Sequence, residues 1–343
     1  MTASQQSGII VYIPLPSLSA SRTRALQLIS HASGLAQHQL RIILSCPDIA
    51  ANASTPRRVW QVLQGLVADF YISASTVAYT CNNPLLNVDI IFEGYCGYDA
   101  WIDYGGLEGG FDAVLCDDQA VLSEANKKRQ SAGLPAFESL ELEPETSKTN
   151  ETPSVTTNSQ EFYHRGSNPP DIYDHIAMGG TFDHLHSGHK ILLTIAAWLS
   201  RLSLFCGVVS PDLLKNKKGA ALLEPIDTRI SNCNTFLYRF KRGGDLVFDV
   251  AQINDPYGPP QDNPKYSAIV GSLETLKGCE AVNDMRIKNG LGDNLLDIYV
   301  IDVISKNSRV GQKDMDTKLS STFIRNYLQQ HNETANQKLE LTK

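Results

Sequence analysis

The sequence predicts an α/β protein built in two parts. Short apolar runs alternate with amphipathic helical patterns on both sides of a polar stretch, which is typical of parallel sheets covered by helices. The polar stretch is rich in Glu, Ser, Thr, Asn and Pro, so it buries too little apolar surface to offset the entropy of ordering it. A length of 343 residues suits two domains. We therefore expect a separate small α/β domain in residues 1–137, a disordered acidic and polar linker in 138–170, a second α/β domain in 171–330 and a tail in 331–343.

The first part shows four apolar runs and two amphipathic patterns. The runs predict strands at residues 8–15, 40–46, 88–95 and 111–118. The amphipathic patterns predict helices at 21–37 and 55–71. This part contains no phosphate loop, metal-ligand spacing or nucleophile motif, and its paired glycines are interpreted as turns. No internal repeat is visible, and the residues alone do not indicate what this part does.

The second part alternates strands and helices more regularly. Its apolar runs predict strands at 174–180, 202–210, 245–253, 266–272 and 295–304. Helices are predicted at 187–202, 225–242 and 273–288, and a last one begins near 321. Strands without polar alternation indicate a parallel sheet buried on both faces. Ligands of such sheets bind beyond the carboxyl ends of the strands.

Charge and cysteine usage exclude several classes of protein. The formal net charge is −7 and the pI about 5.6, which argues against a protein whose main partner is a nucleic acid. Seven scattered cysteines never form C-x-x-C, so they suit neither a disulfide framework nor a zinc ribbon. No signal peptide is visible, and no apolar run approaches the roughly 20 residues that cross a bilayer. We expect a cytoplasmic protein that binds no membrane.

Three of the eight histidines lie within six residues, in the stretch "GGTFDHLHSGHK". Gly179 and Gly180 end a predicted strand and let a ligand approach the backbone. The helix that follows offers unpaired N–H groups to a phosphate, and His186 and His189 lie on one face of its first turn. Three interpretations compete. The histidines cap the helix or sit in the core, or they bind zinc together with His184, or they stabilise a phosphate under displacement.

The third interpretation is favoured because "GTFDHLHSGH" resembles the G-x-F-D-x-x-H-x-G-H motif of the nucleotidyltransferases related to class I aminoacyl-tRNA synthetases. The resemblance implies a Rossmann-like nucleotidyltransferase domain in which His186 and His189 are catalytic. His184 is not a motif position. A lysine after the second strand of such domains binds the reacting phosphates, and Lys215 and Lys217 are the candidates here.

A second stretch, "KLSSTFIRNYL", resembles the S-S-T-x-I-R phosphate-binding turn of the same superfamily. Taken alone, hydroxyl side chains before a helix are more often only a cap. Because the turn lies about 130 residues after the histidines, the resemblance implies that it binds the outer phosphates of a nucleoside triphosphate. The residues that would provide it are Ser320, Ser321, Thr322 and Arg325.

Two further segments resemble the eukaryotic, fungal-type phosphopantetheine adenylyltransferases. They are "FDVAQINDPYGPPQDNP" and "VGSLETLKGCEAVNDMRIKNGL", and the chain departs from the second at Gly271-Ser272-Leu273 and at Cys279, where the family has glycine. By position, the resemblance places the acceptor near Thr181, Asp255 and Tyr257. It assigns ATP binding to Gly179, Gly180, Thr181, Phe182, Gly188, Ser272, Glu274, Thr275 and Arg286, besides the serine-rich turn.

The resemblance implies transfer of AMP from ATP to 4′-phosphopantetheine, giving dephospho-coenzyme A and pyrophosphate by direct in-line attack. Mg²⁺ would arrive with ATP, without a metal site in the protein. No G-x-x-x-x-G-K-[ST] loop occurs, so no fused dephospho-coenzyme A kinase is expected. Two alternatives remain, namely transfer to another phosphorylated acceptor and a non-catalytic nucleotide-binding scaffold. The family resemblance also raises the expectation that the first part docks other enzymes of coenzyme A synthesis.

Overall fold

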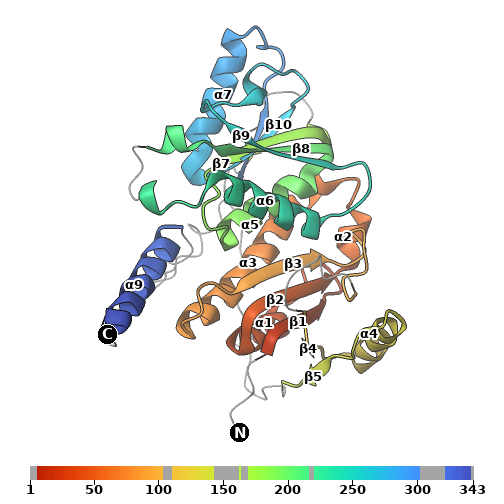
Figure 1. Ribbon diagram of the computed structural model, residues 1–343. Helices are drawn as coiled ribbons and strands as arrows, with labels where there is room; N and C mark the ends of the chain where they lie inside the picture. The colour runs from red at the N-terminus through yellow and green to blue at the C-terminus, as the bar shows by residue number, and fades with distance from the viewer. Residues whose placement is uncertain are drawn as a thin grey trace.

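The fold is seen in a computed structural model that describes residues 6–102, 110–142, 162–163, 169–215, 220–301 and 321–340. It contains two sheets with helices around them, so the predicted α/β class is confirmed (Figure 1). We call residues 6–142 the first half and residues 162–340 the second half. Within the described residues, no helix combines the length and apolarity needed to cross a membrane.

The first half is a five-stranded parallel sheet in the order β3-β2-β1-β4-β5. The sheet extends three residues into the stretch expected as linker, because β5 pairs with β4 there. The helix α4 was not predicted, since its sequence is mostly polar and buries only Leu122, Ala125 and Arg129. The elements are β1 (Gln6–Pro14), α1 (Thr23–Leu35), β2 (Ala36–Ser45), α2 (Pro47–Ala51), η1 (Pro56–Arg58), α3 (Trp60–Thr80), β3 (Asn87–Phe92), β4 (Ala113–Leu115), α4 (Gln119–Ser131) and β5 (Glu138–Leu140).

The second half has six strands in the order β6-β11-β10-β7-β8-β9, of which only β6 is antiparallel to its neighbour. The last helix continues through most of the stretch expected as a tail. The elements are β6 (Phe162–Tyr163), β7 (Tyr173–Gly180), α5 (Ser187–Leu199), β8 (Ser200–Val209), η2 (Pro211–Leu214), η3 (Ala220–Leu222), α6 (Ile226–Phe240), β9 (Val247–Ile253), η4 (Pro259–Gln261), β10 (Ala268–Ser272), η5 (Leu273–Thr275), α7 (Leu276–Lys288), β11 (Asp297–Ile301) and α9 (Ser321–Glu340).

The two halves repeat one topology, although no repeat is visible in the sequence. If β7 to β11 are counted as strands one to five of the second half, both parallel sheets have the order 3-2-1-4-5. In both, a helix follows the first strand, another precedes the third, and a third connects the fourth and fifth. Topology depends on where apolar strands and helices fall along the chain, so it survives where residue identity does not.

The halves share one hydrophobic core. Helices α3, α5 and α6 lie between the two sheets (Figure 1), and a single cluster of buried side chains runs from Ile42 and Phe70 of the first half to Phe240 of the second. The indole of Trp198 on α5 is 1% exposed and donates to the carbonyl of Pro56 at 3.2 Å. The fold therefore buries one face of each half against the other.

Candidate functional site

The candidate site lies where four parallel strands of the second half end. Strands β10, β7, β8 and β9 are neighbours and run in the same direction, so the loops after them meet at one edge of the sheet. The histidine loop, residues 181–186, follows β7, and the loop that contains Lys215 (the lysine loop) follows β8. The loop that begins with Asn254 and contains Asp255 follows β9, and Ser272 ends β10. This edge is where ligands of parallel sheets bind, so the topology brings the predicted segments together.

The histidine loop is a tight turn in which Phe182 and His184 adopt positive φ, at 51° and 44°. Positive φ is unfavourable for these residue types and persists only where the surroundings hold it. Here the ring of Phe182 is completely buried, so only its backbone can face a ligand. Gly180 suits this turn, because a Cβ there would lie 3.1 Å from the Phe182 ring, a tight contact that the ring could relieve only by shifting.

Asp183 holds the loop in place and joins it to the serine-rich turn. Its side chain is fully buried, accepts from the N–H of Glu224 at 2.8 Å and pairs with the guanidinium of Arg325 at 2.5 Å. Its carbonyl accepts from the hydroxyl of Ser321 at 2.8 Å. The structure thus connects the two predicted motifs directly. Arg325 also donates to the hydroxyl of Thr322 at 3.1 Å, so its guanidinium organises the turn.

His186 and His189 form a stacked pair at the start of α5. Their ring centroids are 3.8 Å apart and the rings are inclined by 29°. His186 occupies the N-cap position, and its Nδ1 is buried without a hydrogen-bond partner among the described residues. Burial lowers the pKa of His186 to about 4, with nearby Asp183 opposing and His184 assisting that shift. At neutral pH this imidazole is therefore uncharged.

His184 belongs to a different group of side chains. Its backbone N–H donates to the carboxylate of Glu224 at 2.6 Å, and its ring nitrogens lie 3.8–3.9 Å from carboxylate oxygens of Glu224 and Asp183. The ring does not share the stack of His186 and His189. In the part of the chain that the structure describes, no three His, Cys, Asp or Glu side chains gather as metal ligands would.

Two residues that support the loop were not predicted from the sequence. Arg229 on α6 is 1% exposed and donates to the carbonyls of Thr181, Val209 and Glu224 at 2.8, 2.9 and 3.1 Å. Glu224 accepts from the loop backbone, as described above. An available signal was the position of Arg229 on the apolar face of an amphipathic helix, four residues before Cys233. A cation on that face must satisfy its donors inside the protein.

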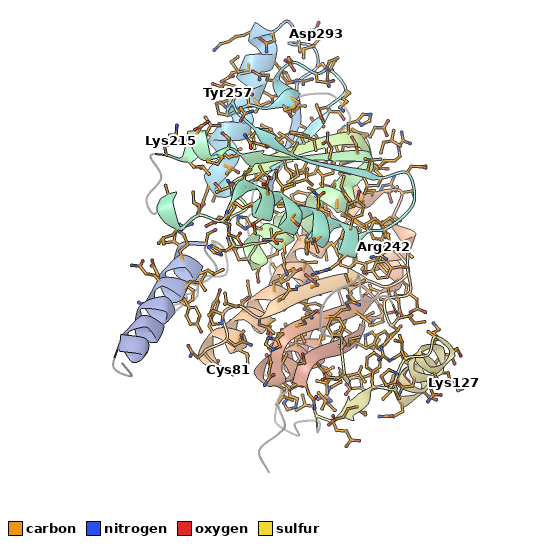
Figure 2. The ribbon with its side chains drawn as sticks, in the orientation of Figure 1. Cys81, Lys127, Lys215, Arg242, Tyr257 and Asp293 are labelled. Carbon is orange, nitrogen blue, oxygen red and sulfur yellow. The ribbon has the colours of Figure 1, made fainter. Side chains whose placement is uncertain are left out.

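The structure shows no contact between the predicted lysines and the histidines among the residues that it describes. Lys215 follows η2 (Figure 2). Its side chain is 72% exposed, and its ammonium pairs with the carboxylate of Asp212 at 2.8 Å. Lys217 lies outside the described residues, as does Ser320 of the serine-rich turn. Their assignments remain predictions.

The turn after β10 contains the predicted Ser272, Glu274 and Thr275. Ser272 and Thr275 form a capping box, in which the N–H of Ser272 donates to the hydroxyl of Thr275 at 2.9 Å. The structure also explains why the chain departs from the family pattern here. A Cβ on Gly271 would lie 2.6 Å from the sulfur of Cys279, so glycine in β10 makes room for the cysteine that replaces a family glycine.

Arg286 was predicted on the nucleotide side, and the structure shows which groups its guanidinium contacts. Its side chain is completely buried. The guanidinium donates to the carbonyls of Pro260 at 2.5 Å and Asn294 at 2.7 Å, with further bonds to Asn263 and Tyr266. Its donors therefore hold the surrounding loops together.

The predicted acceptor residues Asp255 and Tyr257 lie in the loop after β9. The carboxylate of Asp255 accepts from the N–H groups of Tyr257 and Gly258 at 2.9 and 2.7 Å and from the amide of Gln261 at 3.1 Å. Asp255 thus shapes this turn, which is the common role of aspartate in such a sequence. Gly258 completes the turn at φ 59°.

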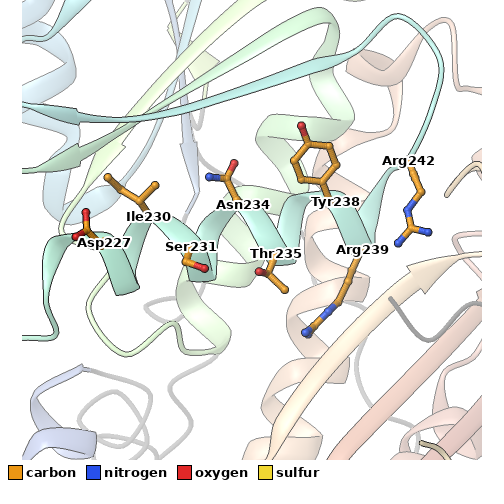
Figure 3. Close-up of a pocket in the computed structure, with 8 residues that line it drawn as sticks. All are labelled: Asp227, Ile230, Ser231, Asn234, Thr235, Tyr238, Arg239 and Arg242. Carbon is orange, nitrogen blue, oxygen red and sulfur yellow. The ribbon is translucent and has the colours of Figure 1, made fainter. Parts of the chain in front are cut away.

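The described residues of the second half line a larger and a smaller hollow. The larger, about 500 Å³, runs along α6 from Asp227 to Arg242 and contains no residue predicted for the site (Figure 3). The smaller, about 160 Å³, lies beside the histidine loop. His184 and His186 line one wall of it, while Ser75, Tyr79 and Leu86 of the first half line the other. The first half therefore reaches the candidate site.

The fold and the paired histidines define a nucleotidyltransferase, and comparison with known proteins agrees. The model of the cytidylyltransferase-like family matches residues 177–325, which begin in β7 and end at Arg325. A phosphopantetheine adenylyltransferase of Pyrobaculum aerophilum is 30% identical over 157 residues, which are 46% of this chain and 93% of that protein. The chain belongs to the cytidylyltransferase-like nucleotidyltransferase superfamily, and its second half is a relative of the phosphopantetheine adenylyltransferases.

Two fungal relatives differ in how far they match. The phosphopantetheine adenylyltransferase of Saccharomyces cerevisiae is 39% identical over 152 residues, 44% of this chain, and the match spans only 48% of that protein. An uncharacterized protein of Schizosaccharomyces pombe is 29% identical over 332 residues, which are 93% of this chain and 96% of its own. The combination of both halves therefore extends to at least one other protein.

Proposed function

We propose that the protein transfers AMP from ATP to 4′-phosphopantetheine and releases dephospho-coenzyme A and pyrophosphate. The observation that carries this proposal is the stacked histidine pair at the start of α5, joined through Asp183 to the serine-rich turn of α9. The similarity of the second half to proteins named phosphopantetheine adenylyltransferase supports the choice of acceptor.

The chemistry requires no general base. A phosphate monoester has its second pKa near 6, so the acceptor is mostly dianionic at pH 7. One of its oxygens attacks the α-phosphorus of ATP in line with the bond to the β-phosphate. The new P–O–P bond forms as the bond to pyrophosphate breaks, and pyrophosphate leaves with the electron pair.

The histidines supply hydrogen bonds where negative charge grows. Because burial holds the pKa of His186 at about 4, the ring is neutral and donates through one N–H, together with His189. Donors already fixed at the position of the developing charge lower the barrier without reorganising. The N-terminus of α5 adds its partial positive charge, and Thr181 lies at the strand end beside it.

The serine-rich turn and the lysine loop hold the outer phosphates in this proposal. Ser321 and Thr322 offer hydroxyls at the start of α9, Ser320 is assigned the same role from the sequence alone, and Arg325 keeps the turn against the histidine loop. The carboxylates nearest the histidines, Asp183 and Glu224, are already bonded to Arg325 and to backbone N–H groups. The site therefore fits a Mg²⁺ ion carried by ATP, which would neutralise the leaving pyrophosphate.

The test is pyrophosphate release by purified full-length protein with Mg·ATP and one acceptor at a time. The acceptors are 4′-phosphopantetheine, glycerol 3-phosphate, phosphoethanolamine and nicotinamide mononucleotide, each repeated with CTP. Release with ATP and 4′-phosphopantetheine alone supports the proposal. Release with another pair would retain the histidine chemistry and replace the acceptor, whereas no release would favour a nucleotide-binding scaffold.

A further inference from the structure

In the first half, the helix before the fifth strand is fixed to that strand by a half-buried asparagine and a buried arginine. The side chain of Asn126 accepts from the N–H of Phe137, the residue before β5, at 2.9 Å. Three residues later, the guanidinium of Arg129 is 2% exposed and donates to the carbonyl of Pro135 at 2.8 Å. It also donates to the carbonyl of Trp101, in the segment between the third and fourth strands, at 3.4 Å.

The second half is closed by the same residue types in the same positions. Asn283 accepts from the N–H of Leu296, the residue before β11, at 2.8 Å. Arg286, again three residues later, donates to Asn294 ahead of the fifth strand and to Pro260 between the third and fourth. In each half a glycine four residues after the arginine has positive φ, 75° and 82°. The two halves share the same strand order, and the same Asn, Arg and Gly positions fix the last helix of each sheet. We take this as evidence that the halves are two copies of one fold.

The first copy lacks the chemistry of the second at its own strand ends. The loop from β1 to α1 contains neither histidine nor glycine, and its Arg22 pairs with Asp69. Arg24, in the first turn of α1, forms two bonds with Asp117 at 2.7–2.8 Å. Glu93 follows the third strand at the same edge. An edge with paired cations and added carboxylates disfavours a nucleoside triphosphate.

The first copy instead binds α5, the helix that carries the histidines, through hydrogen bonds and an ion pair. Lys190 follows His189 directly, is 5% exposed, and directs its ammonium into the first half. The three donors of that ammonium meet the side chain of Asn87, the carbonyl of Val88 and the carboxylate of Asp89 at 2.6–2.8 Å. The other oxygen of Asp89 accepts from Arg239 at 2.8 Å, and Figure 3 shows this arginine extending from α6 toward the first half.

The same copy also contacts the helix that carries the serine-rich turn. On α3, the hydroxyl of Ser75 lies 2.8 Å from that of Ser187, the first residue of α5. One turn further, the ring of Tyr79 packs edge-on against Phe323 of α9, with centroids 5.0 Å apart. The hydroxyl of Tyr327 on α9 donates to the carbonyl of Asn82, just after α3, at 3.2 Å. A single helix of the first copy therefore touches the starts of both motif helices.

We propose that the first half is a second copy of the nucleotidyltransferase fold that has no catalytic site and positions the two phosphate-binding motifs of the other copy. Asp89 is the positioning residue for the histidine helix, acting through Lys190. Tyr79 is the positioning residue for the serine-rich turn, acting through Phe323. The kinetic part of this proposal rests on the proposed adenylyl transfer.

The experiment compares full-length variants below their unfolding temperatures. Tyr79→Leu removes the ring that supports α9, Tyr79→Phe keeps it, and Asp89→Asn removes the charge that holds Lys190. Asn126→Ala is the matched control, because it weakens the closure of the first copy without touching either motif helix. We measure kcat and KM for Mg·ATP, and binding of α,β-methylene-ATP with its stoichiometry.

Tyr79→Leu is expected to raise KM for Mg·ATP about tenfold with a small change in kcat, because the outer phosphates lose their fixed turn. Tyr79→Phe is expected to restore the wild-type value. Asp89→Asn is expected to lower kcat about tenfold and to shift the His186 and His189 ring resonances in NMR spectra. Asn126→Ala should leave these readouts unchanged, and the analogue should bind once per chain.

The proposal is overturned by two bound analogues per chain or by equal effects of Tyr79→Leu and Asn126→Ala. If Asp89→Asn does not fold, Tyr79→Leu and Tyr79→Phe still test whether the first copy positions the serine-rich turn. If wild-type protein releases no pyrophosphate with any acceptor, the proposed function fails on its own. Analogue affinity and the histidine resonances then still show whether the first copy positions the motifs.

Discussion

The ion pairs of Asp89 make a prediction about stability that can be worked out from the structure. Burial alone would raise the pKa of this carboxyl, but Lys190 and Arg239 outweigh burial and lower the pKa from 3.8 to about 2. A carboxyl whose pKa is lower in the folded than in the unfolded protein stabilises the fold above the unfolded pKa. That stabilisation is lost as pH falls toward 2, and it amounts to about 2 kcal/mol at neutral pH.

Asp89→Asn isolates this contribution. At pH 6 the variant leaves two buried cations without their carboxylate, and we expect a loss of about 3–5 kcal/mol in the free energy of unfolding. Between pH 6 and pH 3 the difference between wild type and variant should narrow by about 1 kcal/mol, because wild type alone loses stabilisation as Asp89 is protonated. Urea unfolding at both pH values measures each difference.

The control is Asp117→Asn, which breaks an ion pair with Arg24 at the surface. Its charges remain largely in water, so the substitution should cost little at either pH. A difference for Asp89→Asn that is as small as the control, or that widens as pH falls, would refute the reasoning. The first result would mean that the three charges are not coupled, and the second would reverse the sign of the linkage.

Three further predictions concern the site and the core. His189→Ala should lower turnover by roughly 10²–10³ while the affinity for ATP changes little, since the lost donor acts on the transition state; near-normal turnover would contradict its catalytic role. Gly271→Ala should destabilise the protein by about 1–3 kcal/mol, because the added Cβ would lie 2.6 Å from the Cys279 sulfur and 2.9 Å from the Thr275 hydroxyl; adding Cys279→Gly should recover only part of that loss in thermal unfolding, since the contact with Thr275 remains. A fragment of residues 169–343 should aggregate, because truncation uncovers the buried face of α5 and α6; a monomeric fragment with native near-ultraviolet circular dichroism would show that the second half folds alone.

The parts of the site that the sequence predicted are contiguous in the chain. His186 and His189 stand in one string after an apolar run, so strand, turn and helix could be placed with the residues they carry. The parallel sheet of the second half was predicted for the same reason, because each buried strand appears as an unbroken apolar run. The family resemblance implied only that the loop and the serine-rich turn bind the same nucleotide, and the structure shows that Asp183 links the two.

The parts that could not be predicted depend on partners far away in the sequence. Arg286 stands in a motif-like segment, and only the fold shows that its donors meet carbonyls of separate loops. Lys190 is part of the histidine motif, but its role could not be predicted because its partners, Val88 and Asp89, lie about 100 residues earlier in the sequence. The repeated topology was hidden because it resides in strand order, and because only a few closing residues such as Asn126 and Asn283 are shared.

The common core of the two halves has a consequence for how the enzyme responds to dilution. Two separate subunits joined by such an interface would dissociate once their concentration fell below the dissociation constant. Here one chain carries both, and the tether keeps the local concentration of each copy near the other high at every concentration of protein. Dilution should therefore not separate the two copies, and a cell can keep them together with very few molecules of the chain.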